Sequence, residues 1–459
     1  MNNDTLSEAA PYPLSKYRGS SGEIFHTKHL GKSLKQNSIR GGTVTLAAQA
    51  ARFVLRLLSS AILARLLTPE DYGLIAMTTV VSGLALVLRD GGLPFATIQR
   101  EAITQRQVSL LFWVNVALGL VLASTLVAVS PLVVLMYDEP RLQPLVCALA
   151  IPILLGALAE QHRALLSRQM RFLTLSAIDI GSLFCSLAVG IAMAASHHGY
   201  WSLVAFEICN ASLTVILLWL LLRWRPSLPS RSKSGIAMLR SGGNIMGFNL
   251  LNYFSRNADN ALIGWFWGAM PLGLYSRAYS LLMLPMRNIN APFSVVAIPV
   301  LSRARNNPDT LRCYFLQGAT IVAALVIPTV VCSAVFADDL VRLWLGERWI
   351  ECARLFRLLS VPALLFGASQ PISWLFIVLD RTRIMRNIGV VMAPVNIVAF
   401  CIGLPFGTEG VALGYAISSI MMFFPAARYA LKGTGISVLD FFVTWRQPVI
   451  AACGDAATA

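Results

Sequence analysis

The chain has 459 residues, of which 56% are hydrophobic and only 13% are charged. Because soluble domains carry about 25% charged residues, this composition excludes a soluble globular protein and predicts a polytopic membrane protein. The net charge of +15 could suggest a nucleic-acid partner, but basic cytoplasmic loops between spans explain it better, so no nucleic acid is expected. The eight cysteines and five histidines show no metal-ligand spacing, so no metal site is predicted.

Apolar segments long enough to cross a bilayer follow one another along the chain. Residues 1–39 have no apolar run, which predicts a disordered cytoplasmic tail. Six spans are expected in residues 40–223, near 41–66, 73–90, 108–130, 142–160, 173–195 and 201–222. A cytoplasmic linker, 224–240, begins with a basic, proline-rich stretch. Six more spans are expected in residues 241–431, near 242–267, 273–300, 313–336, 353–379, 387–406 and 409–430.

Two further segments of the second half, 338–351 and 432–459, lie outside the predicted spans. The largest outer connection, 338–351, is predicted to form a short interfacial hairpin or helix. Residues 432–459 are predicted to be a C-terminal tail, or an extra span that is truncated. The fold class is therefore all-α, with about twelve transmembrane helices.

The start of the first half resembles the start of the second. With an offset of 200, residues 40–74 match 240–274 at six positions, among them Arg56 with Arg256 and Gly73 with Gly273. Both segments also carry polar residues three and four apart, which places them on one helical face. A duplicated half is typical of transporters, so two pseudo-symmetric lobes of six helices are expected.

The distribution of basic residues predicts the orientation. The loops that follow even-numbered spans carry 17 Lys and Arg residues, against at most five on the other side. Since positive loops stay in the cytoplasm, both termini are expected there.

Several stretches together resemble the polysaccharide transporter family, the Wzx-type flippases of the multidrug/oligosaccharidyl-lipid/polysaccharide exporter superfamily. They are ILARLLTPEDYGLIAM (62–77), YDEPRLQPL (137–145), RALLSRQMRF (163–172), WRPSL (224–228), RNADNALIG (256–264), LGLYSRAYSLLMLP (272–285) and WLGERW (344–349). The resemblance is greatest to the branch that exports colanic acid and similar exopolysaccharides. It implies two lobes around a central cavity in a bacterial inner membrane. It also implies translocation of an undecaprenyl-diphosphate-linked oligosaccharide to the periplasmic leaflet.

A diphosphate headgroup needs cationic partners, and arginine binds phosphate oxygens with two parallel hydrogen bonds. The candidates for the wall of the cavity are Arg52, Arg56, Arg256, Arg277 and Arg287. The alternative is that these arginines pair with buried carboxylates and hold helices together. Arg65 and Arg89 lie near span ends and are interpreted as snorkelling anchors.

Other polar residues within the spans complete the set of candidates. Asn249, Asn252 and Asn260 could bind glycan hydroxyls or join helices. Asp179, Glu207 and Asp259 are the carboxylates well inside predicted spans, so each could bind a coupling proton or sodium ion. Asp259 could instead neutralise Arg256, which is three residues away.

No catalytic residues and no cofactor are predicted. The expected partners are the lipid-linked substrate, membrane lipids and, further along, a polysaccharide polymerase and export machinery. Two alternatives remain. A multidrug extruder of the same superfamily would favour an acidic cavity, whereas this chain has more arginines than carboxylates in its spans. A membrane polymerase or ligase would need a larger outer domain.

Overall fold

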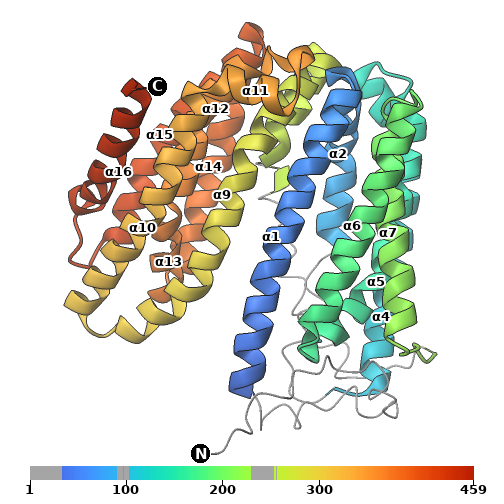
Figure 1. Ribbon diagram of the computed structural model, residues 1–459, viewed down its shortest axis with the longest axis horizontal. Helices are drawn as coiled ribbons and strands as arrows, with labels where there is room; N and C mark the ends of the chain where they lie inside the picture. The colour runs from blue at the N-terminus through green and yellow to red at the C-terminus, as the bar shows by residue number, and fades with distance from the viewer. Residues whose placement is uncertain (1–33, 90–96, 98–102, 229–252, 255, 459) are drawn as a thin grey trace, which may run out of the picture.

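The computed structural model describes residues 34–89, 97, 103–228, 253–254 and 256–458, and the described secondary structure is helical. The helices of the first half form one bundle, as Figure 1 shows. They are α1 (Leu34–Leu66), α2 (Pro69–Arg89), α4 (Gln105–Tyr137), α5 (Leu142–Arg168), α6 (Phe172–Ala195) and α7 (Trp201–Leu221).

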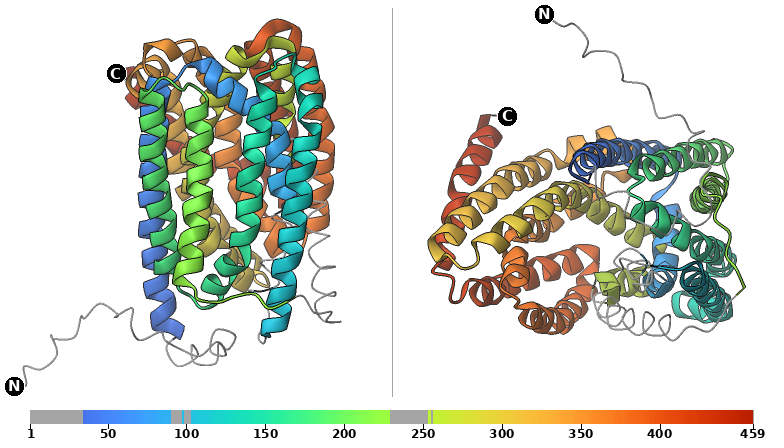
Figure 2. Two further views of the ribbon diagram at one scale, coloured as in Figure 1. Left: turned by 90° about the vertical axis from the view of Figure 1, so that its right-hand side faces the viewer. Right: turned by 90° about the horizontal axis from the view of Figure 1, so that it is seen from below.

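The second half forms another bundle beside the first (Figure 1). It begins with helical residues 256–267. It continues with α9 (Ala269–Ala304), α10 (Pro308–Val335), α11 (Ala337–Trp344), η4 (Glu347–Trp349), α12 (Cys352–Ala368), α13 (Gln370–Val378), α14 (Thr382–Gly403), η5 (Leu404–Phe406) and α15 (Gly407–Leu431). Helix α16 (Val438–Thr458) lies at the periphery against α10 (Figure 2). We call the two bundles the N-lobe and the C-lobe.

Ten stretches of the described residues are long and apolar enough to span a membrane. One of them, 383–431, contains both α14 and α15, which pack against each other. Residues 242–252 and 255 of the predicted seventh span, 242–267, lie outside the described residues, as do most of the N-terminal tail and of the linker. The all-α, polytopic class predicted from composition is confirmed.

Local sequence explains where several helices begin. Thr104 accepts a hydrogen bond from the backbone N–H of Gln107, and the Gln107 side chain accepts one from the Thr104 backbone. This reciprocal pair is a capping box, which satisfies two donors at the start of α4. Asn307 caps α10 in front of Pro308, where the missing N–H of proline costs no helical hydrogen bond.

The predicted outer connection, 338–351, does contain helix: the eight-residue α11 and the short η4. The equivalent connection in the N-lobe, between α4 and α5, is only residues 138–141. The lobes therefore differ at this end. We refer to it as the α11 end; Figure 1 shows it opposite the start of α1.

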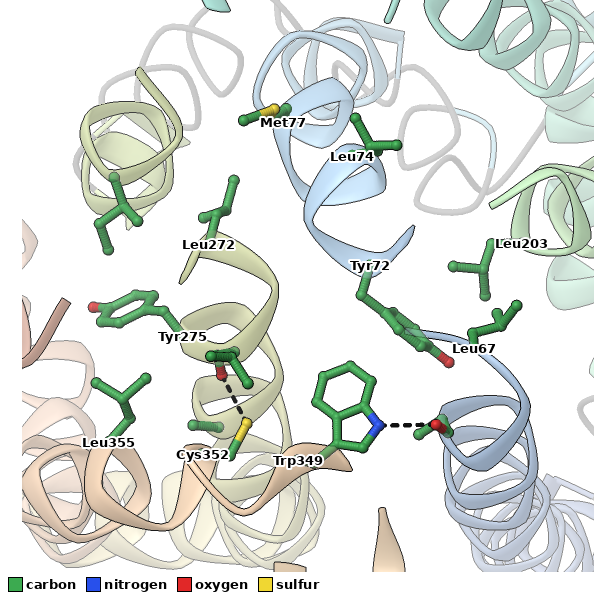
Figure 3. Packing of buried hydrophobic residues seen from close by; sticks show 14 of the residues in the cluster. Leu67, Tyr72, Leu74, Met77, Leu203, Leu272, Tyr275, Trp349, Cys352 and Leu355 are labelled. Carbon is green, nitrogen blue, oxygen red and sulfur yellow. Dashed lines mark hydrogen bonds between the residues drawn. The ribbon is translucent and has the colours of Figure 1, made fainter. Parts of the chain in front are cut away.

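The largest buried apolar cluster crosses from one lobe to the other at the α11 end. It includes Leu67 and Tyr72 of the N-lobe together with Leu272, Trp349 and Leu355 of the C-lobe, as Figure 3 shows. Since apolar packing excludes water, the two lobes are joined there by a continuous core.

Candidate functional site

The predicted site residues of the N-lobe fall into two environments. Arg52 on α1 forms an ion pair with Asp179 on α6, with an N···O distance of 2.5 Å. The same carboxylate binds Arg163 on α5 at 2.9 Å. Asp179 thus connects three helices, which is the helix-joining role that the sequence left open for these residues.

One helical turn further along α1, Arg56 is exposed. No described carboxylate forms an ion pair with it. Glu207 on α7 is also exposed, and Arg56 acts on it electrostatically. An exposed guanidinium that forms no ion pair with a described carboxylate has N–H donors left over for an anionic ligand.

In the C-lobe, Arg256 is exposed and its Cζ atom lies 5.9 Å from the centre of the Phe366 ring. Arg287 on α9 is exposed as well. Both guanidiniums are near enough to Tyr279 to act on it electrostatically. These two arginines form the cationic part of the candidate site in the C-lobe.

Asp259 does not pair with Arg256 within the part of the chain that the structure describes. It is 4% exposed, and it accepts hydrogen bonds from the Tyr275 hydroxyl at 2.9 Å and from the Asn260 backbone at 2.8 Å. The side-chain oxygen of Asn260 is buried without a hydrogen-bond partner among the described residues. A buried carboxylate with no cation partner must acquire a proton or a metal cation, or be costly to keep charged.

Arg277 lies elsewhere. Its Cζ atom is 3.7 Å from the centre of the Tyr72 ring on α2, at the α11 end. Arg65 also belongs there, because it donates to the backbone carbonyl of Leu343 in the C-lobe. The interpretation of Arg65 and Arg89 as snorkelling anchors stays a prediction. Arg89 also has a protein partner, Glu160, at 3.6 Å.

The predicted candidates Asn249 and Asn252 lie outside the described residues. Sequence reasoning also missed the tyrosines around Asp259, namely Tyr275, Tyr279 and Tyr415. The spacing of four between the first two, in LGLYSRAYS, was the available signal. No group of three or more His, Cys, Asp or Glu residues that could hold a metal ion occurs in the described segments.

Two lobes of helices that are long and apolar enough to cross a membrane define a polytopic membrane protein. The sequence profile of the polysaccharide biosynthesis protein family matches residues 62–354, and the chain belongs to that family. The resemblance stated from the sequence motifs is confirmed.

Individual relatives agree with this assignment. The lipopolysaccharide biosynthesis protein WzxC of Escherichia coli is 26% identical over 396 residues, covering 85% of this chain and 80% of the relative. The teichuronic acid biosynthesis protein TuaB of Bacillus subtilis is 28% identical, covering 74% of this chain and 71% of TuaB.

Solved structures show the same fold at low sequence identity. The lipid II flippase MurJ in an inward closed conformation has a TM-score of 0.70 at 14% identity, covering 92% of this chain and 93% of that chain. An inward-facing multidrug resistance MATE family transporter of the MOP superfamily has a TM-score of 0.67 at 14% identity, covering 90% and 99%. The chain thus shares the fold of these two proteins.

Proposed function

We propose that this protein is a flippase that moves an undecaprenyl-diphosphate-linked oligosaccharide from the cytoplasmic to the periplasmic leaflet. The product would serve exopolysaccharide or lipopolysaccharide synthesis. Membership of a polysaccharide biosynthesis family supports the glycan part of the proposal. The fold shared with a lipid II flippase is compatible with a lipid-linked substrate. Transport needs no covalent step, so the protein is proposed not to be an enzyme.

One observation carries the proposal. Arg56 and Arg256 occupy equivalent positions in the two halves, both are exposed, and neither forms an ion pair with a described carboxylate. A guanidinium within a membrane-spanning segment is costly unless it faces protein or water. Because neither arginine forms an ion pair with a described carboxylate, the two together suit an anionic ligand such as a diphosphate. Arg287 adds to this charge on the C-lobe side.

Arg52 and Arg277 are not among the proposed substrate contacts. Arg52 is engaged with Asp179 and Arg277 with Tyr72, so the proposed substrate contacts are Arg56, Arg256 and Arg287. Asn260 lies next to the coupling site described below, and its unpartnered oxygen suits a role in cation binding better than one in glycan binding.

Transport would be driven by a proton or sodium ion at Asp259. Asp179 already binds two arginines, and Glu207 has Arg56 nearby. Asp259 is the candidate that is buried without a cation among the described residues, and the Tyr275 hydroxyl could stay hydrogen-bonded to either charge state. Binding of a cation in the C-lobe would then bias the lobes between two arrangements by alternating access.

The proposed location is a bacterial inner membrane with both termini in the cytoplasm, as the positive-inside rule requires. The α11 end then faces the periplasm. A polysaccharide polymerase and export machinery would use the flipped lipid there.

The test is mass spectrometry of lipid extracts from a strain lacking this protein. The proposal expects undecaprenyl-diphosphate repeat units to accumulate, and expects plasmid-borne protein to clear them. A strain without accumulation, but sensitive to cationic drugs, would instead favour a multidrug extruder, as the MATE-like fold allows.

A further inference from the structure

The α11 end holds an interlobe contact that the proposed substrate site does not use. Helices α2 and α9 begin side by side there. A Cβ atom on Gly73 would lie 1.7 Å from the carbonyl oxygen of Ala269, and one on Gly273 would lie 1.8 Å from that of Pro69. No side chain fits at either distance, so both positions require glycine.

This crossing follows the duplication. Pro69 and Gly73 are each 200 residues before Ala269 and Gly273, so each half supplies the same contact to the other. Alternating access moves one repeat against the other, so a close backbone approach between the repeats on one side must loosen when that side opens.

Aromatic and cationic side chains extend the crossing. Tyr72 of the N-lobe meets two groups of the C-lobe: the Arg277 guanidinium 3.7 Å from its ring centre, and the Trp349 ring at 5.4 Å in an edge-on arrangement. Cation–π and edge-to-face contacts are both favourable in these geometries. Tyr72 is thus held between α9 and η4.

The α11–η4 segment fastens the N-lobe through two backbone carbonyls. The indole Nε1–H of Trp349 donates to the Ala64 carbonyl at 2.8 Å, drawn as a dashed line in Figure 3. Arg65 donates in return to the Leu343 carbonyl. Trp349 is fully buried. Among the described connections, the one between α10 and α12 contains this segment, whereas its N-lobe equivalent is residues 138–141. The segment is therefore not a feature that the two halves share.

We infer that Gly73, Gly273, Tyr72, Arg277 and Trp349 form the outer gate of the transporter, with α11–η4 as its latch. In the described state the gate is closed, which separates the proposed substrate site from the periplasm. Opening must break the Trp349–Ala64 hydrogen bond and lift Tyr72 from Arg277. The inference rests on the proposed function for the assignment of this end to the periplasm. The contacts between the lobes do not depend on that function.

The native Cys352 provides a reporter. It is fully buried, it is three residues after Trp349, and its sulfur lies 3.2 Å from the Leu274 carbonyl (Figure 3). With the other seven cysteines changed to alanine, a membrane-impermeant maleimide added to cells with a permeabilised outer envelope reports access from the periplasm.

Gly73→Ala and Gly273→Ala should force α2 and α9 apart and raise the rate of Cys352 labelling several-fold. Trp349→Phe keeps an aromatic ring but loses the hydrogen bond, so its rate should rise about fivefold, the factor that corresponds to one net hydrogen bond. Gly181→Ala is the matched control, because nothing lies within 4 Å of its added Cβ atom.

Equal labelling of Gly73→Ala, Trp349→Phe and Gly181→Ala at normal membrane abundance would overturn the gate. If the Gly73→Ala protein does not reach the membrane, Trp349→Phe against Gly181→Ala decides alone. The assay needs no substrate. A gate that responds in a protein whose deletion accumulates no lipid-linked glycan would therefore refute the proposed function and leave the gate standing.

Discussion

Arginines that the sequence places on the same helical face have different surroundings in the structure. Arg52 and Arg56 are one turn apart on α1, yet the first is engaged by a carboxylate on α6 and the second is exposed. Periodicity predicted that both lie on one polar face, but the partner of Arg52 is 127 residues away. Only the packed helices decide which guanidinium remains free for a ligand.

Arg56→Ala and Arg256→Ala should each abolish export while leaving normal amounts of protein in the membrane. Arg→Lys should retain part of the activity, since lysine keeps the charge but lacks the planar fork that binds two phosphate oxygens. Export is measured as surface polysaccharide, with immunoblots of the membrane fraction as the abundance control.

The double variant Arg256→Ala/Asp259→Ala separates substrate binding from charge neutralisation. Because the structure shows no ion pair between these two residues, removal of Asp259 should not rescue Arg256→Ala. Restored export in the double variant would defeat the substrate role of Arg256.

Glu139 offers a pH-dependent prediction outside the membrane spans. Hydrogen bonds from Arg141 lower the pKa of Glu139 below its usual 4.5, so the ion pair stabilises the fold above that pH and is lost as the pH falls through the lowered value. Arg141 is 43% exposed, which limits the contribution to less than about 1 kcal/mol. The melting temperature of purified protein should therefore fall slightly less between pH 7 and acid in Glu139→Gln than in the native protein; a larger fall in the variant would contradict this.

At the scale of helices, hydropathy predicted the order of spans well because each must be long and apolar. The helix ends were harder: α4 continues to Tyr137 through Pro131, beyond the predicted end at 130. Neighbouring helices can satisfy the carbonyl that a proline frees. The contact of Tyr72 with Trp349 could not be predicted, since periodicity carries no information about residues so far apart in the chain.

Asp179 should stabilise the N-lobe as a link between α1, α5 and α6. Asp179→Ala leaves the guanidiniums of Arg52 and Arg163 without their shared acceptor, which should cost about 1–3 kcal/mol. Thermal unfolding in detergent measures this, with Glu207→Gln as the control because Glu207 forms no ion pair among the described residues. A smaller loss for Asp179→Ala than for the control would exclude the linking role.

In the whole molecule, the α11 end and the basic loops define the proposed orientation in the membrane: the α11 end faces the periplasm and the basic loops face the cytoplasm. The turn between α6 and α7 lies at the α11 end, since a Cβ atom on Gly199 would be 2.9 Å from the Asp71 carboxylate at the start of α2. The order of the spans and the charges of the loops had predicted that residues near 198 and 345 lie on the same side. The interlobe contact required the structure, because it depends on how two halves pack.

Reporter fusions after residues 230 and 384 should be cytoplasmic, and fusions near residues 198 and 345 periplasmic. The basis is the excess of Lys and Arg in the loops opposite the α11 end. An inversion at any of these four sites would contradict the two-lobe topology.

As a flippase, the protein should by itself move a lipid-linked oligosaccharide across the bilayer. The most direct measurement uses purified protein in proteoliposomes that contain an undecaprenyl-diphosphate oligosaccharide, with a membrane-impermeant glycosidase outside. Native protein should make the inner-leaflet glycan available for cleavage, whereas Arg56→Ala protein should not. If native protein allows cleavage of only the glycan already in the outer leaflet, under both a proton and a sodium gradient, the protein does not flip this lipid.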